Sequence, residues 1–237
     1  MPQVLRKSRG SDRGLFFRYR IRRSLVYTVG CVLPCCNALP PMATTFWRIK
    51  WLSKAVFALC LLPLVYLAWL WWSHKLGINQ IERVARFTGD WTLRFLLITL
   101  AITPLRRIKA LSPLVKFRRM LGLFTFFYGC LHMLHYFAID VQWNWKVIEE
   151  DLTVRRFFIV GFAALMLMVP LAATSNNAAI RWMGGARWQL LHRLVYVSAI
   201  LGVIHYALQG KTLTQTPLMY GAILAVLLLS RVVFRFV

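Results

Sequence analysis

The chain has 237 residues, of which 59% are hydrophobic, and its mean hydropathy of +0.59 is too high for an ordinary soluble domain. Its 30 lysines and arginines outnumber its 7 acidic residues and give a formal net charge of +23. The basic residues lie mostly between or beside apolar runs, which favours a role in membrane orientation and argues against nucleic-acid binding.

Residues 1–41 differ in composition from the rest of the chain. The stretch 1–23 holds eight basic residues against a single acid, Asp12, and an apolar stretch follows it. We interpret residues 1–41 as a disordered basic extension or as a misassigned start, with translation then beginning at Met42. The pair Arg22 and Arg23 before an apolar run also allows a twin-arginine export signal, although no convincing cleavage site follows.

Residues 42–237 are expected to form one all-α membrane domain, a bundle of six transmembrane helices. Each span is judged against the roughly 20 apolar residues that a bilayer core requires. The six spans cover residues 52–72, 91–107, 119–139, 157–174, 188–208 and 217–236. The second and fourth are short and hold Pro104 and Pro170 near their ends, so a buried re-entrant pair is the alternative to simple spans.

The charges of the short loops predict the orientation of these spans. Residues 105–119, between the second and third spans, carry six basic residues and no acid, and Arg181 and Arg187 lie between the fourth and fifth spans. On the opposite side, residues 140–151 hold four acids. Because basic loops stay in the cytoplasm, both termini are predicted to be cytoplasmic.

Four histidines fall within two of the predicted spans. His132 and His135 lie in the third span, and His192 and His205 lie in the fifth. At about 1.5 Å per residue, His132 lies roughly 20 Å along its span and His205 roughly 20 Å beyond His192, so His132 and His205 have similar depths. Ionisable side chains at membrane depth need a partner or a role, which here is either hydrogen bonding between helices or clamping of a haem iron from both faces.

Three neighbouring residues extend this hypothesis. His135 follows His132 by three residues, so it could replace His132 as a ligand or hydrogen-bond to a haem propionate. Arg118 lies on the same helix face as His132, where it could pair with a propionate or a flavin phosphate, or help to hold a second haem near His192. His192 and His205 are about 140° apart on an ideal helix and need not face one cavity.

Four stretches of the chain carry a family resemblance. Together the stretches resemble the MsrQ (YedZ-like) family, haem-binding membrane subunits of the bacterial periplasmic protein-methionine-sulfoxide reductase system, within the ferric-reductase-like transmembrane superfamily. The resemblance covers roughly residue 47 to the C-terminus. The stretches are residues 87–107, 118–132, 173–197 and 204–208.

The resemblance assigns site residues and a role. The haem-associated histidines of the family fall on His132, His192 and His205, and its arginine falls on Arg118, whereas His135 is not part of the pattern. The resemblance implies a multi-pass protein of the bacterial inner membrane that binds haem b, is also associated with flavin mononucleotide (FMN), and has no catalytic centre of its own. Such a subunit passes electrons from a flavin reductase or the quinone pool to a periplasmic molybdopterin-containing reductase, which repairs oxidised methionines in envelope proteins.

Two other function classes are weighed against this one. A transmembrane ferric reductase or oxidase-like cytochrome b usually carries a flavin and nicotinamide domain after its last span, whereas this chain ends at Val237. A non-redox transporter would use the histidines as a proton relay, but it typically has charged pairs near the bilayer midplane. The acidic residues 140–151 are either a docking surface for a partner or a plain solvated loop.

Overall fold

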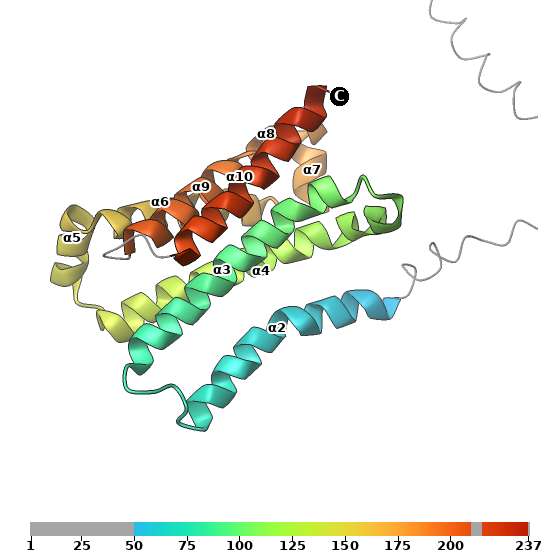
Figure 1. The fold of residues 1–237 in the computed structure, drawn as a ribbon. Helices are drawn as coiled ribbons and strands as arrows, with labels where there is room; N and C mark the ends of the chain where they lie inside the picture. Colours follow the sequence, from blue (N-terminus) through green and yellow to red (C-terminus); the bar gives the residue numbers. More distant parts are fainter. Residues whose placement is uncertain (1–49, 210–214, 237) are drawn as a thin grey trace, which may run out of the picture. The chain divides into compact units, whose positions relative to one another are not determined.

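The computed structural model describes residues 50–209 and 215–236, and every regular element in these ranges is helical, as the sequence predicts (Figure 1). The extension expected over residues 1–41 and the candidate start at Met42 lie outside the described residues. The elements are α2 (Lys50–Trp72), α3 (Gln80–Leu105), the 3-10 helix η1 (Lys109–Phe117), α4 (Arg118–His135), the π-helical turn η2 (Tyr136–Asp140), α5 (Trp145–Val154), α6 (Arg156–Ala173), α7 (Asn177–Met183), α8 (Gly185–Leu191), α9 (Leu194–Gln209) and α10 (Gln215–Phe236).

Five segments of the described chain are long and apolar enough to cross a membrane, which confirms a multi-pass membrane protein. These segments are Trp51–Trp72, Lys109–Asp140, Arg156–Ala173, Gly185–Gln209 and Gln215–Val233. The helix expected as a sixth span, α3, is not among them because charged residues such as Asp90 and Arg94 lower its hydropathy. The total of six spans therefore stays a prediction.

Helix α3 begins earlier than the sequence indicated. Asn79 caps its N-terminus: the side-chain oxygen of Asn79 accepts from the backbone N–H of Glu82 at 3.3 Å, and its amide donates to the Glu82 carboxylate at 2.7 Å. The charged residues that follow this cap lower the local hydropathy, so a prediction based on hydropathy missed the first turns of the helix. Pro104 in α3 and Pro170 in α6 both lie inside uninterrupted helices, so neither helix turns back as a re-entrant segment.

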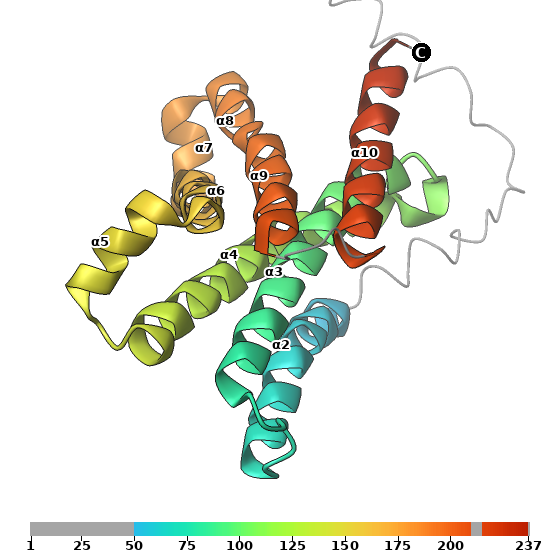
Figure 2. The ribbon, with the colours of Figure 1, turned by 60° about the vertical axis from the view of Figure 1, so that its left-hand side comes forward.

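Helix α3 lies against four other helices, α2, α4, α9 and α10, while α6 packs mainly on α9 and also on α4 (Figure 2). A buried apolar cluster joins α3 to α9 and α10. Its members are Leu93, Leu96, Leu97, Leu100, Ala199, Tyr220 and Leu224. Because α4 pairs with α3 and α9 pairs with α6, side chains on α4 and α9 can meet between the two pairs.

Arg231 fixes α10 to the same core. Its guanidinium donates to the carbonyl oxygen of Leu100 at 2.9 Å, to the Thr103 hydroxyl at 2.8 Å and to the Tyr196 hydroxyl. An arginine within a membrane segment is expensive unless its N–H groups are satisfied by neighbouring helices. Arg231 therefore links α10 to α3 and α9.

Three local features were not expected. The fifth predicted span is interrupted after His192, where α8 ends and α9 restarts at Leu194. A π-helical turn follows α4, and the short helix α5 stands where an acidic loop was expected. Helices α7 and α8 and the C-terminal end of α10 lie at one end of the described helices, and α5 lies at the other (Figure 1).

The acidic stretch 140–151 is only partly exposed. Glu149 and Glu150 are exposed, but Asp151 is 3% exposed. Its carboxylate accepts a hydrogen bond from the Tyr136 hydroxyl at 2.5 Å and pairs with Arg155 at 2.8 Å. Asp151 therefore holds α5 against the start of α6 and is not available to a partner, which corrects the expectation for this position.

Candidate functional site

The structure brings His132 on α4 and His205 on α9 together. Their ring centroids lie 6.2 Å apart, and the ring planes are inclined by 80°. Metal–imidazole bonds are about 2 Å long, so two imidazoles on opposite sides of one metal have centroids about 6 Å apart. The observed separation therefore suits two axial ligands of one iron.

Hydrogen bonds to the backbone orient both rings. The Nδ1 atom of His132 lies 3.0 Å from the carbonyl oxygen of Ala85 and 3.3 Å from the Thr88 hydroxyl, both on α3. The Nδ1 atom of His205 lies 2.7 Å from the carbonyl oxygen of Phe157 on α6. Because a carbonyl only accepts, each Nδ1 must carry the proton, and each neutral ring presents the lone pair of Nε2. Metal-binding histidines are commonly oriented by this arrangement.

Two glycines make room for these rings. A Cβ atom added at Gly89 would lie 3.3 Å from Cε1 of His132. One added at Gly161 would lie 2.7 Å from Cε1 of His205 and would also overlap its Nδ1 atom. Position 161 therefore accepts only glycine unless the ring of His205 moves.

A cavity of about 450 Å³ lies between the two helix pairs and includes both rings in its lining. Its volume is within the range of cofactor and ligand pockets. The lining is mainly apolar on α6, where Phe157, Phe162, Leu165 and Met168 face it, whereas Arg155 and several other polar residues line it near α5. A flat, largely apolar macrocycle with one polar edge fits this distribution.

His135 lines the same cavity. It is 7% exposed, and neither of its ring nitrogens has a hydrogen-bond partner within the described part of the chain. His135 ends α4, and the π-helical turn Tyr136–Asp140 follows it directly. The structure therefore places His135 beside the His132–His205 pair, although His135 lies outside the family pattern.

His192 and Arg118 lie together at a second cavity of about 330 Å³. The ring of His192 stacks on Trp188 with centroids 3.8 Å apart, and its Nδ1 lies 3.0 Å from the carbonyl oxygen of Trp188. Its Nε2 atom is buried and has no hydrogen-bond partner among the described residues. Arg119 also lines this cavity, so the lining is basic.

The two histidines of the fifth predicted span thus line separate cavities, His205 the first and His192 the second. Their angular separation on a helix already argued against one shared cavity, and the break after His192 separates them further. Arg118 lines the cavity of His192, as their positions on the third and fifth spans suggested. The candidate residues therefore form two groups, one around each cavity, as the sequence suggested for His192.

The sequence reasoning missed the contribution of α3 and α6. Thr88 and Gly89 contact the ring of His132, and Phe157 and Gly161 contact the ring of His205. Gly129 on α4 serves helix packing instead, because a Cβ there would lie 3.0 Å from Leu165. Gly161 could have been found by comparing the estimated membrane depth of each glycine with the depths of His132 and His205, because a glycine level with a histidine leaves room for its ring.

Comparisons with known proteins agree with this geometry. Residues 55–203 match the family described as ferric reductase like transmembrane component. The chain is 48% identical over 192 residues to the protein-methionine-sulfoxide reductase heme-binding subunit MsrQ of Polaromonas naphthalenivorans, covering 78% of this chain and 88% of that one. It is also 48% identical over 189 residues to the MsrQ of Azospira oryzae, covering 79% and 81%, and 47% identical over 198 residues to that of Ralstonia nicotianae, covering 83% and 89%. Through these relatives and the matched transmembrane family, the chain belongs to the MsrQ family of heme-binding subunits.

Proposed function

We propose that this protein is a haem b electron-transfer subunit of a methionine-sulfoxide reductase system in the bacterial inner membrane. The observation that carries the proposal is the facing pair His132 and His205, whose centroid separation of 6.2 Å suits one iron between them. The names of its relatives support two further parts of the proposal, heme binding and the association with a methionine-sulfoxide reductase. In this proposal the subunit carries electrons, and the reaction with methionine sulfoxide takes place on its partner.

A haem in the first cavity supplies reversible one-electron chemistry. The protein contributes the two Nε2 lone pairs of His132 and His205, and the carbonyl groups of Ala85 and Phe157 keep these nitrogens unprotonated and aimed inward. The apolar side chains of α6 exclude water from the cavity, and a low local dielectric favours the ligated neutral rings. Residues of four helices, α3, α4, α6 and α9, would thus hold and orient the two histidines that bind the haem.

The second cavity is our candidate for the electron-entry side. His192 and Arg118 line it together with Arg119 and Trp188. Arginines bind carboxylates and phosphates, and an indole stacks on flat rings, so the lining suits a second haem or FMN. The FMN proposal otherwise rests on the family resemblance.

We propose α3 as the sixth span, with both termini in the cytoplasm. Two features support this topology: α3 packs among α2, α4, α9 and α10, and the basic residues gather at the α3–α4 connection and near α7 and α8. The α5 end is then periplasmic. It would face a periplasmic molybdopterin-containing reductase, and a flavin reductase or the quinone pool would deliver electrons at the other end.

The function is tested by the colour of the full-length protein purified from haem-replete cells. We expect a haem b spectrum whose bands sharpen on reduction with dithionite, and loss of most of this signal in both His132→Ala and His205→Ala. The matched control is His74→Asn, because His74 is exposed and has a φ of 52°, which asparagine tolerates. Colourless wild-type protein would contradict the proposal.

The ferric-reductase match favours one second candidate, a reductase that acts alone. That function predicts reduction of a ferric chelate by a nicotinamide donor without added proteins. The electron-transfer function predicts no such activity until a donor protein and the periplasmic reductase are supplied together. The same purified sample distinguishes the two.

A further inference from the structure

His135, which is not part of the family pattern, is a buried polar residue whose burial is not explained by the contacts described above. Both of its ring nitrogens lack a hydrogen-bond partner within the described part of the chain, and the side chain is 7% exposed. An unsatisfied buried polar group costs about 1–3 kcal/mol, so a native structure rarely keeps one without a ligand or water beside it. The residue lines the 450 Å³ cavity, so whatever satisfies it enters from there.

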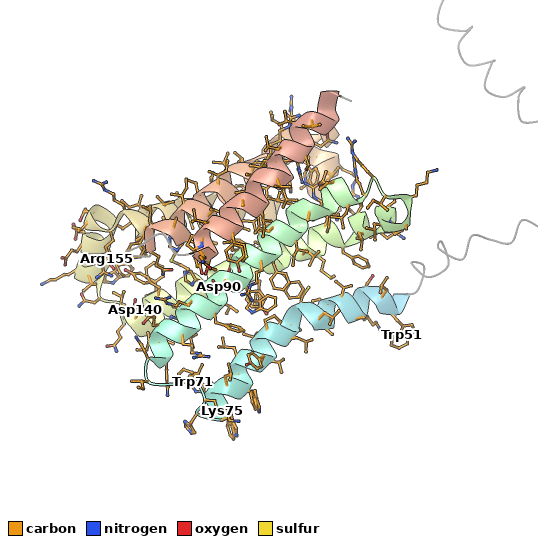
Figure 3. All side chains as sticks on the ribbon, viewed as in Figure 1. Trp51, Trp71, Lys75, Asp90, Asp140 and Arg155 are labelled. Carbon is orange, nitrogen blue, oxygen red and sulfur yellow. The ribbon has the colours of Figure 1, made fainter. Side chains whose placement is uncertain are left out.

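The position of His135 along α4 points to one edge of that cavity. It lies three residues beyond His132, which is about 4.5 Å nearer the α5 end of the helix. Arg155 and Asp140, which also line the cavity, lie at this end beside α5 (Figure 3). The carboxylate of Asp151 pairs with the guanidinium of Arg155, whose side chain is half exposed. Arg155 therefore brings a positive charge to this end of the cavity.

The nearby acids are partly neutralised. Glu82 pairs with Arg86 at 2.5 Å, and Asp151 pairs with Arg155. Asp140 is exposed. The cavity edge near His135 therefore offers hydrogen-bond donors to an anion, whereas the α6 side offers apolar contacts.

We propose that His135 receives the carboxylate edge of the bound macrocycle, donating a ring N–H to one propionate while Arg155 attracts the other. The inference rests on the proposed function, because haem b is amphipathic and carries both propionates on one edge. This assignment orients the macrocycle with its propionates toward the α5 end. His135 is a positioning residue and does not bind the iron.

The test compares haem b with its dimethyl ester, which keeps the macrocycle and lacks both carboxylates. Full-length protein produced in haem-deficient cells is titrated with each, and the low-spin absorption bands report binding. Wild type is expected to bind haem b at least about tenfold more tightly than the ester, since hydrogen bonds to charged groups are strong. His135→Leu is expected to lose most of this preference and to keep the same bands, and His135→Gln, which retains an N–H donor, is expected to restore it.

The matched control is Leu134→Met, which changes an exposed residue of α4 that does not line the cavity and should keep the wild-type preference. Equal binding of haem b and ester by wild type overturns the inference, and this result needs no variant to fold. If His135→Leu keeps the preference for haem b over the ester, the inference is also overturned. His135 is then a buried residue whose hydrogen bonds are made with water. Altered iron bands in His135→Leu would instead make His135 a ligand. Wild type that binds neither compound removes the proposed function itself.

Discussion

The Nδ1 atom of His205 on α9 lies 2.7 Å from the carbonyl oxygen of Phe157 on α6. This hydrogen bond joins the two most closely paired helices at the candidate haem site. It also orients the ring, whose centroid lies 6.2 Å from that of His132. The ring cannot move closer to α6, because it already lies directly against Gly161 of that helix.

We expect Gly161→Ala to displace the His205 ring and to abolish low-spin haem binding, since the added methyl group overlaps the ring. Haem content per protein and the reduced absorption spectrum measure the effect. Gly221→Ala is the control, because a Cβ there would lie 3.7 Å from Val203, an ordinary contact, and Gly221 does not line the cavity. A wild-type spectrum in Gly161→Ala would contradict the ring position described here.

His192→Ala is expected to leave the spectrum of the first haem unchanged, because His192 lines a separate cavity. If a second haem binds there, the haem-to-protein ratio falls by about half while the remaining bands keep their shape. Pyridine haemochrome analysis against total protein gives this ratio. Loss of all haem in this variant would show that the two cavities form one site.

Asp151→Asn is expected to loosen α5, because the buried carboxylate accepts from Tyr136 and pairs with Arg155. Because the Arg155 side chain is half exposed and water can satisfy it, we expect a cost of about 1 kcal/mol. Amide hydrogen exchange should accelerate in α5 and at the start of α6. Glu150→Gln, at an exposed position one residue earlier, should leave the exchange rates unchanged.

Tyr128→Phe is expected to weaken the attachment of α2. The buried hydroxyl of Tyr128 donates to the backbone oxygen of Cys60 at 2.9 Å, and its loss should lower the free energy of unfolding by about 1 kcal/mol. Thermal unfolding of the purified protein measures this change. The haem bands should stay as in wild type, because Tyr128 does not line the first cavity.

The pairing of His132 with His205 was predictable because it follows from helical rise and orientation alone. Equal depth on two spans that cross the membrane in the same direction leaves few other positions where their side chains can meet. The all-helical membrane fold followed from long apolar runs for the same reason. Both predictions depend on the regular geometry of the α-helix and not on how individual side chains pack.

The parts that the sequence did not reveal depend on local hydrogen bonds and close contacts. The start of α3 is fixed by Asn79 and Glu82, whose polarity pointed away from a span. The burial of Asp151 depends on Tyr136, which lies on a π-helical turn without a recognisable pattern. Gly161 matters only because His205 happens to lie against it. Each of these is a pairwise contact between distant positions.

The break between α8 and α9 has a consequence for how such a chain can change. His192 caps the C-terminus of the short helix α8, whereas His205 lies well inside α9, so the two residues belong to different helical segments. A substitution near α7 and α8 that repositions His192 need not alter the contacts of His205, which are made by α6. The lining of the second cavity can therefore vary among related proteins without disturbing the pair His132 and His205.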